Sequence, residues 1–132
     1  MGLLQRDDGA LLLEQGYDDI KQEPFYRLLG GGIEFGETGI QAIKREFLEE
    51  LGLEIQVEAP LGTSENIFTF NGTPGHQIIL LYKCRFADEA VTQKATLPRV
   101  DGTNAEAVWR TPAQIKAEGA NLYPEDIWAY MA

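Results

Sequence analysis

The sequence lacks the usual marks of membrane, secreted and disulfide-rich proteins. It contains no apolar run near the roughly 18 residues that a membrane span needs, and its N-terminus has no basic segment followed by an apolar one. These absences argue against a membrane partner and a signal peptide, and they favour a cytoplasmic location. The single cysteine, Cys84, cannot form an intramolecular disulfide and is expected to be a buried or half-buried strand residue.

Positive charge is also scarce. The chain has 11 Lys and Arg against 21 Asp and Glu, which gives a formal net charge of -10 at pH 7. Long nucleic acids are bound by basic patches, so this balance argues against them as partners. A small phosphorylated ligand stays compatible, because a few local cations and a bound metal can neutralise a diphosphate.

Enough apolar material is present for one core. With 132 residues and 44% hydrophobic content, we expect a single domain over residues 1–132. Periodicity, capping and turn signals predict a strand pair at 3–5 and 10–14, strands at 25–29, 53–57, 66–70, 77–86 and 105–110, and helices at 39–51, 112–118 and 124–130.

The most informative segment is the run GGIEFGETGIQAIKREFLEELGL, which spans Gly31 to Leu53. Thr38 with Gln41 three residues later predicts a capping box at a helix start, and Gly52 supplies the left-handed residue that often ends a helix. An apolar stripe at spacings of three and four lies between them. A helix over residues 39–51 following a glycine-rich loop is therefore predicted.

Three glutamates of this helix share one face. Glu46, Glu49 and Glu50 stand at i, i+3 and i+4, where like charges repel by a few tenths of a kcal/mol per pair. A bound cation would reverse the sign of this effect, and oxygen ligands without histidine or cysteine suit Mg²⁺ or Mn²⁺ better than zinc or copper. The alternative is a solvated acidic helix face without a ligand.

The glycines and glutamates together resemble a known motif. The order Gly31, Glu37, Arg45-Glu46, Glu49-Glu50 and Gly52, with apolar Phe47 and Leu53, matches the Nudix box of the Nudix hydrolase family at every specified position. The resemblance implies an α/β fold, the Nudix-type α/β/α sandwich with a mixed β-sheet. It also implies a pyrophosphohydrolase.

The same resemblance implies a metal site. In the family, the carbonyl of the residue that matches Gly31 helps to bind the metal, the glutamates that match Glu46 and Glu50 are the main carboxylate ligands, and the one that matches Glu49 assists. Mg²⁺ or Mn²⁺ is the implied cofactor. The glycines also allow backbone groups to approach a metal or a phosphate closely.

Other residues of the box receive supporting roles by resemblance. Arg45 is expected to orient the catalytic glutamate, and Glu37 is expected to brace the loop against the helix. Both residues have a simpler interpretation as surface ion-pair partners. Glu34 is a candidate for a metal or substrate contact through water, with solvent exposure as the alternative.

The implied reaction is attack of water on phosphorus in a nucleoside diphosphate linked to another group. A carboxylate would accept the proton of this water. Glu46 is one candidate for this base, and Glu106 and Asp101 are candidates from outside the box. Family members differ in where the base lies, so the sequence leaves this choice open.

Candidate substrate contacts lie outside the box. Phe68, Phe70, Tyr17 and Tyr26 could stack on a base, although aromatic strand residues also serve as core. His76 is a candidate for a substrate contact or for a hydrogen bond within a turn.

The segment from Ala87 to Asn104 is long for a hairpin loop, which leaves room for a lid or for a contact between two copies in a homodimer. Two cations of this segment, Lys94 and Arg99, could meet phosphate, or they could be solvated surface charges.

Two functions therefore stand side by side. The first is a Mg²⁺-dependent hydrolase that cleaves the diphosphate bond of a nucleotide or nucleotide-sugar type of substrate. The second is a ligand-sensing or protein-interaction module that keeps the fold without turnover. Intact glutamates at the positions of Glu46, Glu49 and Glu50 favour the hydrolase over the module. An isomerase built on the same fold is disfavoured because no suitably placed cysteine accompanies the box.

Overall fold

A computed structural model describes residues 1–103 and 105–131, so Asn104, the end of the expected long loop, and Ala132, the end of the expected domain, lie outside the described residues. The elements in chain order are β1 (Gly2–Leu3), β2 (Leu11–Asp18), β3 (Glu23–Leu28), α1 (Gly39–Leu51), β4 (Ile55–Phe70), β5 (Thr73–Phe86), the 3₁₀ helix η1 (Glu89–Gln93), β6 (Thr96–Pro98), β7 (Glu106–Arg110), α2 (Pro112–Ala117), β8 (Asn121–Tyr123) and the 3₁₀ helix η2 (Glu125–Tyr130).

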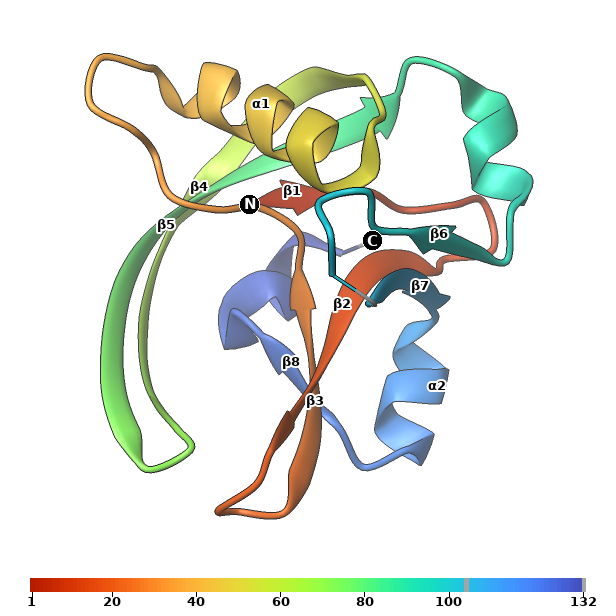
Figure 1. The fold of residues 1–132 in the computed structure, drawn as a ribbon. Coiled ribbons are helices and arrows are strands. Elements are labelled where there is room, and N and C mark those ends of the chain that lie inside the picture. Colours follow the sequence, from red (N-terminus) through yellow and green to blue (C-terminus); the bar gives the residue numbers. More distant parts are fainter. Residues whose placement is uncertain (104, 132) are drawn as a thin grey trace.

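The strands form two mixed sheets. The first has the order β1-β5-β4, with β1 parallel to β5, and the second has the order β6-β7-β2-β3-β8, with β3 parallel to β8. Helix α1 lies over one side of the sheets, and α2 and η2 lie on the other (Figure 1). The predicted α/β sandwich is confirmed. Parallel and antiparallel strand pairs occur in both sheets, whereas one mixed sheet was expected.

Helix α1 forms for local reasons, as the sequence predicts. The Thr38 hydroxyl accepts a hydrogen bond from the Gln41 backbone N–H, and the Gln41 side chain accepts one from the Thr38 backbone N–H, which satisfies two free amides of the first turn. At the other end Gly52 adopts φ 67° and donates to the carbonyl of Leu48. The predicted bounds 39–51 are those observed.

Strand β2 is apolar on both faces because each face covers a separate core. Leu12 packs with the buried residues under α1, whereas Leu11 and Leu13 pack with those under α2 and η2. The first core also contains Ile43, Phe47, Leu51, Ile55, Cys84, Phe86 and Trp109, and the second contains Tyr26, Leu28, Leu81, Ile115 and Ile127. The expectation of a buried Cys84 is confirmed, and burial raises the pKa of its thiol to about 12.

The β4–β5 hairpin is longer than the sequence analysis predicts. Instead of separate strands at 53–57 and 66–70, one strand runs from Ile55 to Phe70, with two irregularities in its pairing to β5 near Ala59 and Gly62. Bulges of this kind add residues without ending a strand, so they interrupt the alternation on which the prediction depends. Asn71 and Gly72 form the two-residue turn with φ 49° and 79°, typical of a type I′ hairpin.

The N-terminal pairing is predicted in part. Segments 3–5 and 10–14 are joined, as expected, by an antiparallel bridge between Gln5 and Leu11 and by two backbone hydrogen bonds beside it. The pairing is short, however, and β1 pairs with β5, which the sequence does not predict. The expected loop after Ala87 contains η1 and β6, and Leu97 of β6 is buried against the sheet. Val91 and Leu97 are buried, whereas most of the other described residues of this segment are exposed. A role as a lid or as a contact between two copies stays a prediction.

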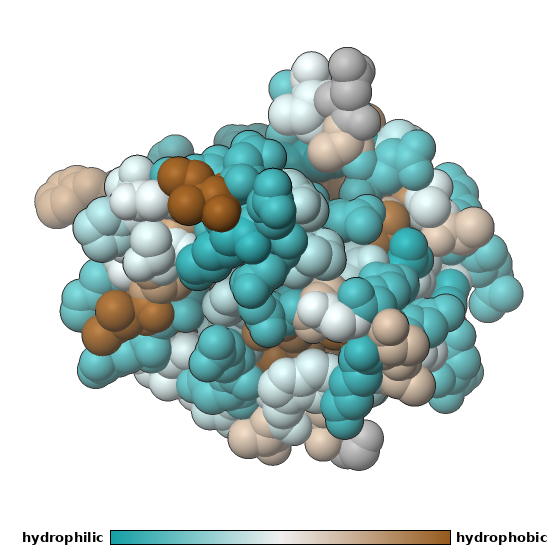
Figure 2. All heavy atoms as spheres, turned by 90° about the horizontal axis from the view of Figure 1, so that it is seen from below, coloured by the Kyte–Doolittle hydropathy of each residue, from teal (hydrophilic) through white to brown (hydrophobic). Residues whose placement is uncertain are grey.

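Polar residues dominate the end of the molecule on which the hairpin tips lie. Viewed from this end, the surface is mostly hydrophilic, and its hydrophobic residues are scattered (Figure 2). None of the helices in the described residues has the length and apolarity needed to cross a membrane.

Replacing Phe47 by Ala tests the core under α1. Phe47 is 0% exposed and its ring meets that of Phe86 edge-on at 6.2 Å, so truncation leaves a cavity and is expected to lower the free energy of unfolding by about 3 to 5 kcal/mol. Leu48→Ala, one residue on but 53% exposed, is expected to change it by no more than about 0.5 kcal/mol. Urea unfolding measures both, and equal losses would contradict this division of the helix.

Candidate active site

The glycine loop and α1 bring a backbone segment and a carboxylate into close contact. Gly31 follows β3 and lies so near the Glu46 carboxylate that a Cβ at this position would overlap it, whereas a Cβ at Gly32 would meet nothing within 4 Å. A side chain at position 31 would therefore have to displace the end of the Glu46 side chain. The close approach leaves the backbone of Gly31 and the carboxylate of Glu46 on one small surface.

Arg45 holds the loop against the helix. Its guanidinium donates to both carboxylate oxygens of Glu37 at 2.6 and 3.1 Å and to the carbonyl of Gly32 at 2.9 Å. It also donates to Oε1 of Glu46 at 2.9 Å and to Oε2 of Glu49 at 3.2 Å. These hydrogen bonds, with Glu37 first, raise the pKa of Arg45 and lower that of Glu37.

Arg45 thus fixes one oxygen of Glu46, and the two supporting residues predicted by resemblance, Arg45 and Glu37, bond each other.

Glu50 is the buried member of the glutamate face. The residue is 8% exposed, and its Oε2 has no hydrogen-bond partner in the described residues. Burial, followed by the negative charge of Glu46, raises the pKa of Glu50 to about 7. A buried carboxylate oxygen without a partner is rare and costly, so this atom needs a ligand that the protein itself does not supply.

A second group of charges reaches Glu50 from the opposite side. Arg99 donates to Glu14 and to Asp101 and lies 3.6 Å from Oε1 of Glu50. Glu14 in turn accepts a hydrogen bond of 2.7 Å from Nε of Arg27, its cross-strand neighbour. The Arg99 hydrogen bond lowers the pKa of Asp101 to about 2. Arg99, a candidate phosphate ligand, is thus already surrounded by carboxylates.

The residues fit a hard divalent cation with open positions. No three or more acidic, histidine or cysteine side chains among the described residues converge as a complete metal cage. The carboxyl groups of Glu46 and Glu50 contact each other beside the Gly31 backbone, and Oε2 of Glu50 is the oxygen without a partner among the described residues. Mg²⁺ is usually held by one or two carboxylates and keeps several waters, which is the type of site this arrangement offers. Glu49 is 57% exposed at its side chain and lies beyond Arg45.

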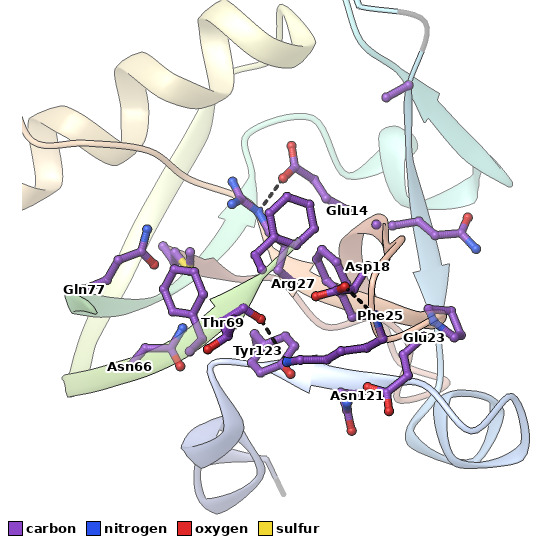
Figure 3. A pocket seen from close by; sticks show the side chains of 18 of the residues that line it. Glu14, Asp18, Glu23, Phe25, Arg27, Asn66, Thr69, Gln77, Asn121 and Tyr123 are labelled. Atoms are coloured by element: carbon purple, nitrogen blue, oxygen red, sulfur yellow. Dashed lines mark hydrogen bonds and ion pairs between the residues drawn. The ribbon is translucent and has the colours of Figure 1, made fainter. Parts of the chain in front are cut away.

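A pocket of 340 Å³ adjoins these charges. It lies between the β2–β3 and β4–β5 hairpins, and β8 closes one side. Glu14 and Arg27 line it, so it touches the charge network that reaches Glu50. Figure 3 shows the ion pair of Arg27 and Glu14 at the edge of this pocket. The side chains of Phe25, Tyr123, Asn66 and Gln77 lie around the pocket.

The lining combines flat aromatic rings with amide groups. Phe25 meets Phe70 edge-on at 5.6 Å and Tyr123 edge-on at 5.8 Å, and Phe68 faces the same space from β4. Amide and hydroxyl side chains from four strands complete the wall: Gln15, Asn66, Thr69, Gln77 and Asn121. Such a surface can stack on a planar ring and hydrogen-bond its edge.

Some of the predicted substrate residues line this pocket and others do not. Phe68 and Phe70 line it, and so does Glu106, which begins β7 and is exposed. Tyr26 is 1% exposed in the core, and Tyr17 is absent from the lining. His76 pairs with Ile67 and therefore lies on the outer face of the hairpin, opposite the face of Phe68.

Glu34, the remaining candidate, lies beside the glycine loop. Its side chain is 69% exposed and stands 3.8 Å from Arg45. Its backbone N–H donates to Glu37 at 2.8 Å. Among the described contacts Glu34 therefore contributes to the loop and to the charge around Arg45.

Sequence reasoning missed two residues of the site, Glu14 and Arg27. Glu14 directly follows the apolar run Leu11 to Leu13 in β2, and Arg27 stands between Tyr26 and Leu28 in β3. A charge inside an otherwise buried strand, with an opposite charge on the neighbouring strand, was the available signal.

Comparisons with known proteins agree with this geometry. The model of the NUDIX domain matches residues 1–128. A MutT-like protein of Streptomyces ambofaciens is 26% identical over 122 residues, which cover 92% of this chain and 68% of the relative.

Solved structures give the same result. The solution structure of the E. coli ORF135 protein superposes with a TM-score of 0.58 at 28% identity, covering 96% of this chain and 79% of that one. A NUDIX hydrolase from Nitrosomonas europaea shares the fold, with a TM-score of 0.56 at 23% identity and coverage of 89% and 74%. With the matched domain and the glutamate site on one chain, this protein belongs to the Nudix family and is a Nudix-type pyrophosphohydrolase.

Proposed function

We propose that this chain is a Mg²⁺-dependent or Mn²⁺-dependent hydrolase that cleaves the diphosphate bond of a nucleoside diphosphate linked to another group. The observation that carries the proposal is the buried, unpartnered oxygen of Glu50 beside Glu46 and the Gly31 backbone. Nudix hydrolases generally use divalent metal ions and act on small phosphorylated substrates, which supports both parts of it.

Glu46, Glu50 and the backbone of Gly31 would hold the cation, and Glu49 would assist from the exposed side. A divalent cation there would neutralise charge on the diphosphate oxygens, acidify the attacking water and align the reacting groups. Glu46, one oxygen of which accepts from Arg45 at 2.9 Å, is the first candidate to accept a proton from this water. Glu106, at the edge of the pocket, is the second candidate for the base.

Arg27 is the cation that we propose for the substrate's diphosphate. Its side chain is 38% exposed and lines both the aromatic pocket and the hollow beside Gly31, whereas that of Arg99 is 12% exposed and enclosed by acids. Arg27 can therefore reach a phosphate lying between the pocket and the glutamates.

The aromatic and amide lining supports a nucleotide as the substrate. Phe25 and Phe68 offer rings for stacking, and Asn66 and Gln77 offer donors and acceptors for the edge of a base. The similarity to a MutT-like protein is in keeping with this class.

Glu50→Gln tests the reaction. The variant keeps the shape but removes the charge, so kcat with a panel of nucleoside diphosphate derivatives and Mg²⁺ or Mn²⁺ is expected to fall at least about a hundredfold. Products are followed by phosphate release and chromatography. Glu54→Gln, on an exposed residue beyond α1, is the matched control and is expected to retain wild-type rates. Wild-type turnover in Glu50→Gln would overturn the metal-site assignment.

Gly31→Ala and Gly32→Ala separate the site from stability. A methyl group at Gly31 displaces only the end of the flexible Glu46 side chain, so the melting temperature should change little while kcat/KM falls about tenfold to a hundredfold. At Gly32 the added methyl meets open space, so both quantities should stay near wild type. If the two variants behave alike, the close approach of Gly31 and Glu46 has no role in catalysis.

Metal binding is expected to stabilise the fold without any substrate. A cation that binds only the native state raises the melting temperature by mass action, so millimolar Mg²⁺ should shift the wild type upward and Glu50→Gln much less. Glu65→Gln, on exposed β4, controls for general charge effects. Equal shifts in all three proteins would show that the cation binds elsewhere.

A further inference from the structure

Two hairpins that belong to different sheets are tied together at their tips. The turn after β2 contributes Asp18, which is 4% exposed, and the turn between β4 and β5 contributes Asn71. Oδ2 of Asp18 accepts a hydrogen bond of 3.1 Å from the backbone N–H of Asn71. In return, Oδ1 of Asn71 accepts one of 2.8 Å from the backbone N–H of Asp19.

Further contacts join the tips of the β2–β3 and β4–β5 hairpins. Lys21 donates from Nζ to the carbonyl of Thr69 at 2.9 Å, and the side chain of Ile20 lies against Gly72. Oδ1 of Asp18 also accepts from the backbone N–H groups of Ile20 and Lys21 at 3.0 and 2.9 Å, which fixes its own turn. We call the contacts of Asp18, Asp19 and Lys21 with Thr69 and Asn71 the tip latch.

The tip latch borders the aromatic pocket. Asp18, Lys21 and Thr69 are themselves part of the lining, and the edge-on contact of Phe25 with Phe70 joins the same two hairpins. Each wall of the pocket therefore comes from a different sheet. The separation of these walls depends on what holds the hairpin tips together.

Apart from the Phe25–Phe70 and Ile20–Gly72 contacts, the tips lie away from both cores. Ile20 is 68% exposed, Asn71 is exposed, and the buried core residues of β4 and β5 lie nearer the opposite ends of these strands. Single hydrogen bonds at an exposed edge contribute modestly to stability, so the tips can part without unfolding either core.

We propose that Asp18 and Asn71 are positioning residues that hold the two aromatic walls at the spacing that a substrate's base requires. This role rests on the proposed nucleotide substrate, and it assigns the tip latch to affinity for the base and not to the chemical step. The reacting end, at Glu46 and Glu50, is held by Arg45 and Arg99, which share no hydrogen bond with the latch.

Asp18→Asn and Asn71→Gly are the test variants. An amide at position 18 cannot accept from all three N–H groups that Asp18 serves, and glycine at position 71 loses the Oδ1 acceptor while tolerating the φ of 49°. Asp7→Asn changes the same charge in an exposed turn and is the control for Asp18→Asn.

Kinetics give the first readout. For a nucleoside diphosphate derivative, each latch variant is expected to raise KM about threefold to tenfold and to leave kcat near wild type. For a dialkyl diphosphate, which has the scissile bond but no base, KM should be unchanged. A loss in kcat, or an equal rise in KM for both substrates, would overturn the positioning role.

Amide hydrogen exchange gives a readout that needs no turnover. The N–H groups of Asp19 and Asn71 should exchange faster in the variants, and saturating nucleoside monophosphate should slow them in the wild type but not in a Phe68→Ala variant. If no compound is hydrolysed but this protection by nucleotide is seen, the latch proposal stands and the proposed reaction fails. If nucleotide leaves exchange at both amides unchanged, the latch proposal fails whatever the activity.

Discussion

The structure depends on bringing two carboxylates of one helix together in a poorly solvated place. Glu46 and Glu50 are one turn apart on α1, and Glu50 is almost completely buried. Two like charges in such a place repel strongly and lose hydration, and the pKa of Glu50, raised to about 7, reflects both effects. The described residues compensate only in part, because Oε2 of Glu50 has no hydrogen-bond partner among them.

Two arginines compensate for part of this negative charge, each from a different side. Arg45 neutralises the exposed side through Glu37, Glu46 and Glu49, and Arg99 approaches Glu50 from the side of β2 and β6. Neither guanidinium bonds Oε2 of Glu50. Arg45 therefore bonds Oε1 of Glu46 and Arg99 lies near Oε1 of Glu50, while Oε2 of Glu50 stays without a partner among the described residues. Full neutralisation by protein side chains would have stabilised the apo fold while removing the place for a metal.

Local features of this site could be predicted from the sequence, and long-range ones could not. The bounds of α1 follow from Thr38, Gln41 and Gly52, whose hydrogen bonds lie within a few residues of the chain. The pairing of β1 with β5 and the uninterrupted course of β4 depend on residues some eighty positions away or on bulges, for which a short window contains no signal. The contact between Glu14 and Arg99 is of the same kind, since its partners lie on separate strands and far apart in sequence.

Glu14 connects the two ends of the site. Through Arg99 it belongs to the network around Glu50, and through Arg27 it belongs to the pocket that holds the aromatic rings. A substrate that places its phosphates between the two ends must compete with Glu14 for Arg27, so binding of the phosphates and the arrangement of charges near Glu50 are coupled. The chain has a net charge of -10, so most of its surface repels a phosphate. Arg27 offers a half-exposed positive charge between the aromatic pocket and the hollow beside Gly31, which favours a phosphate at this place.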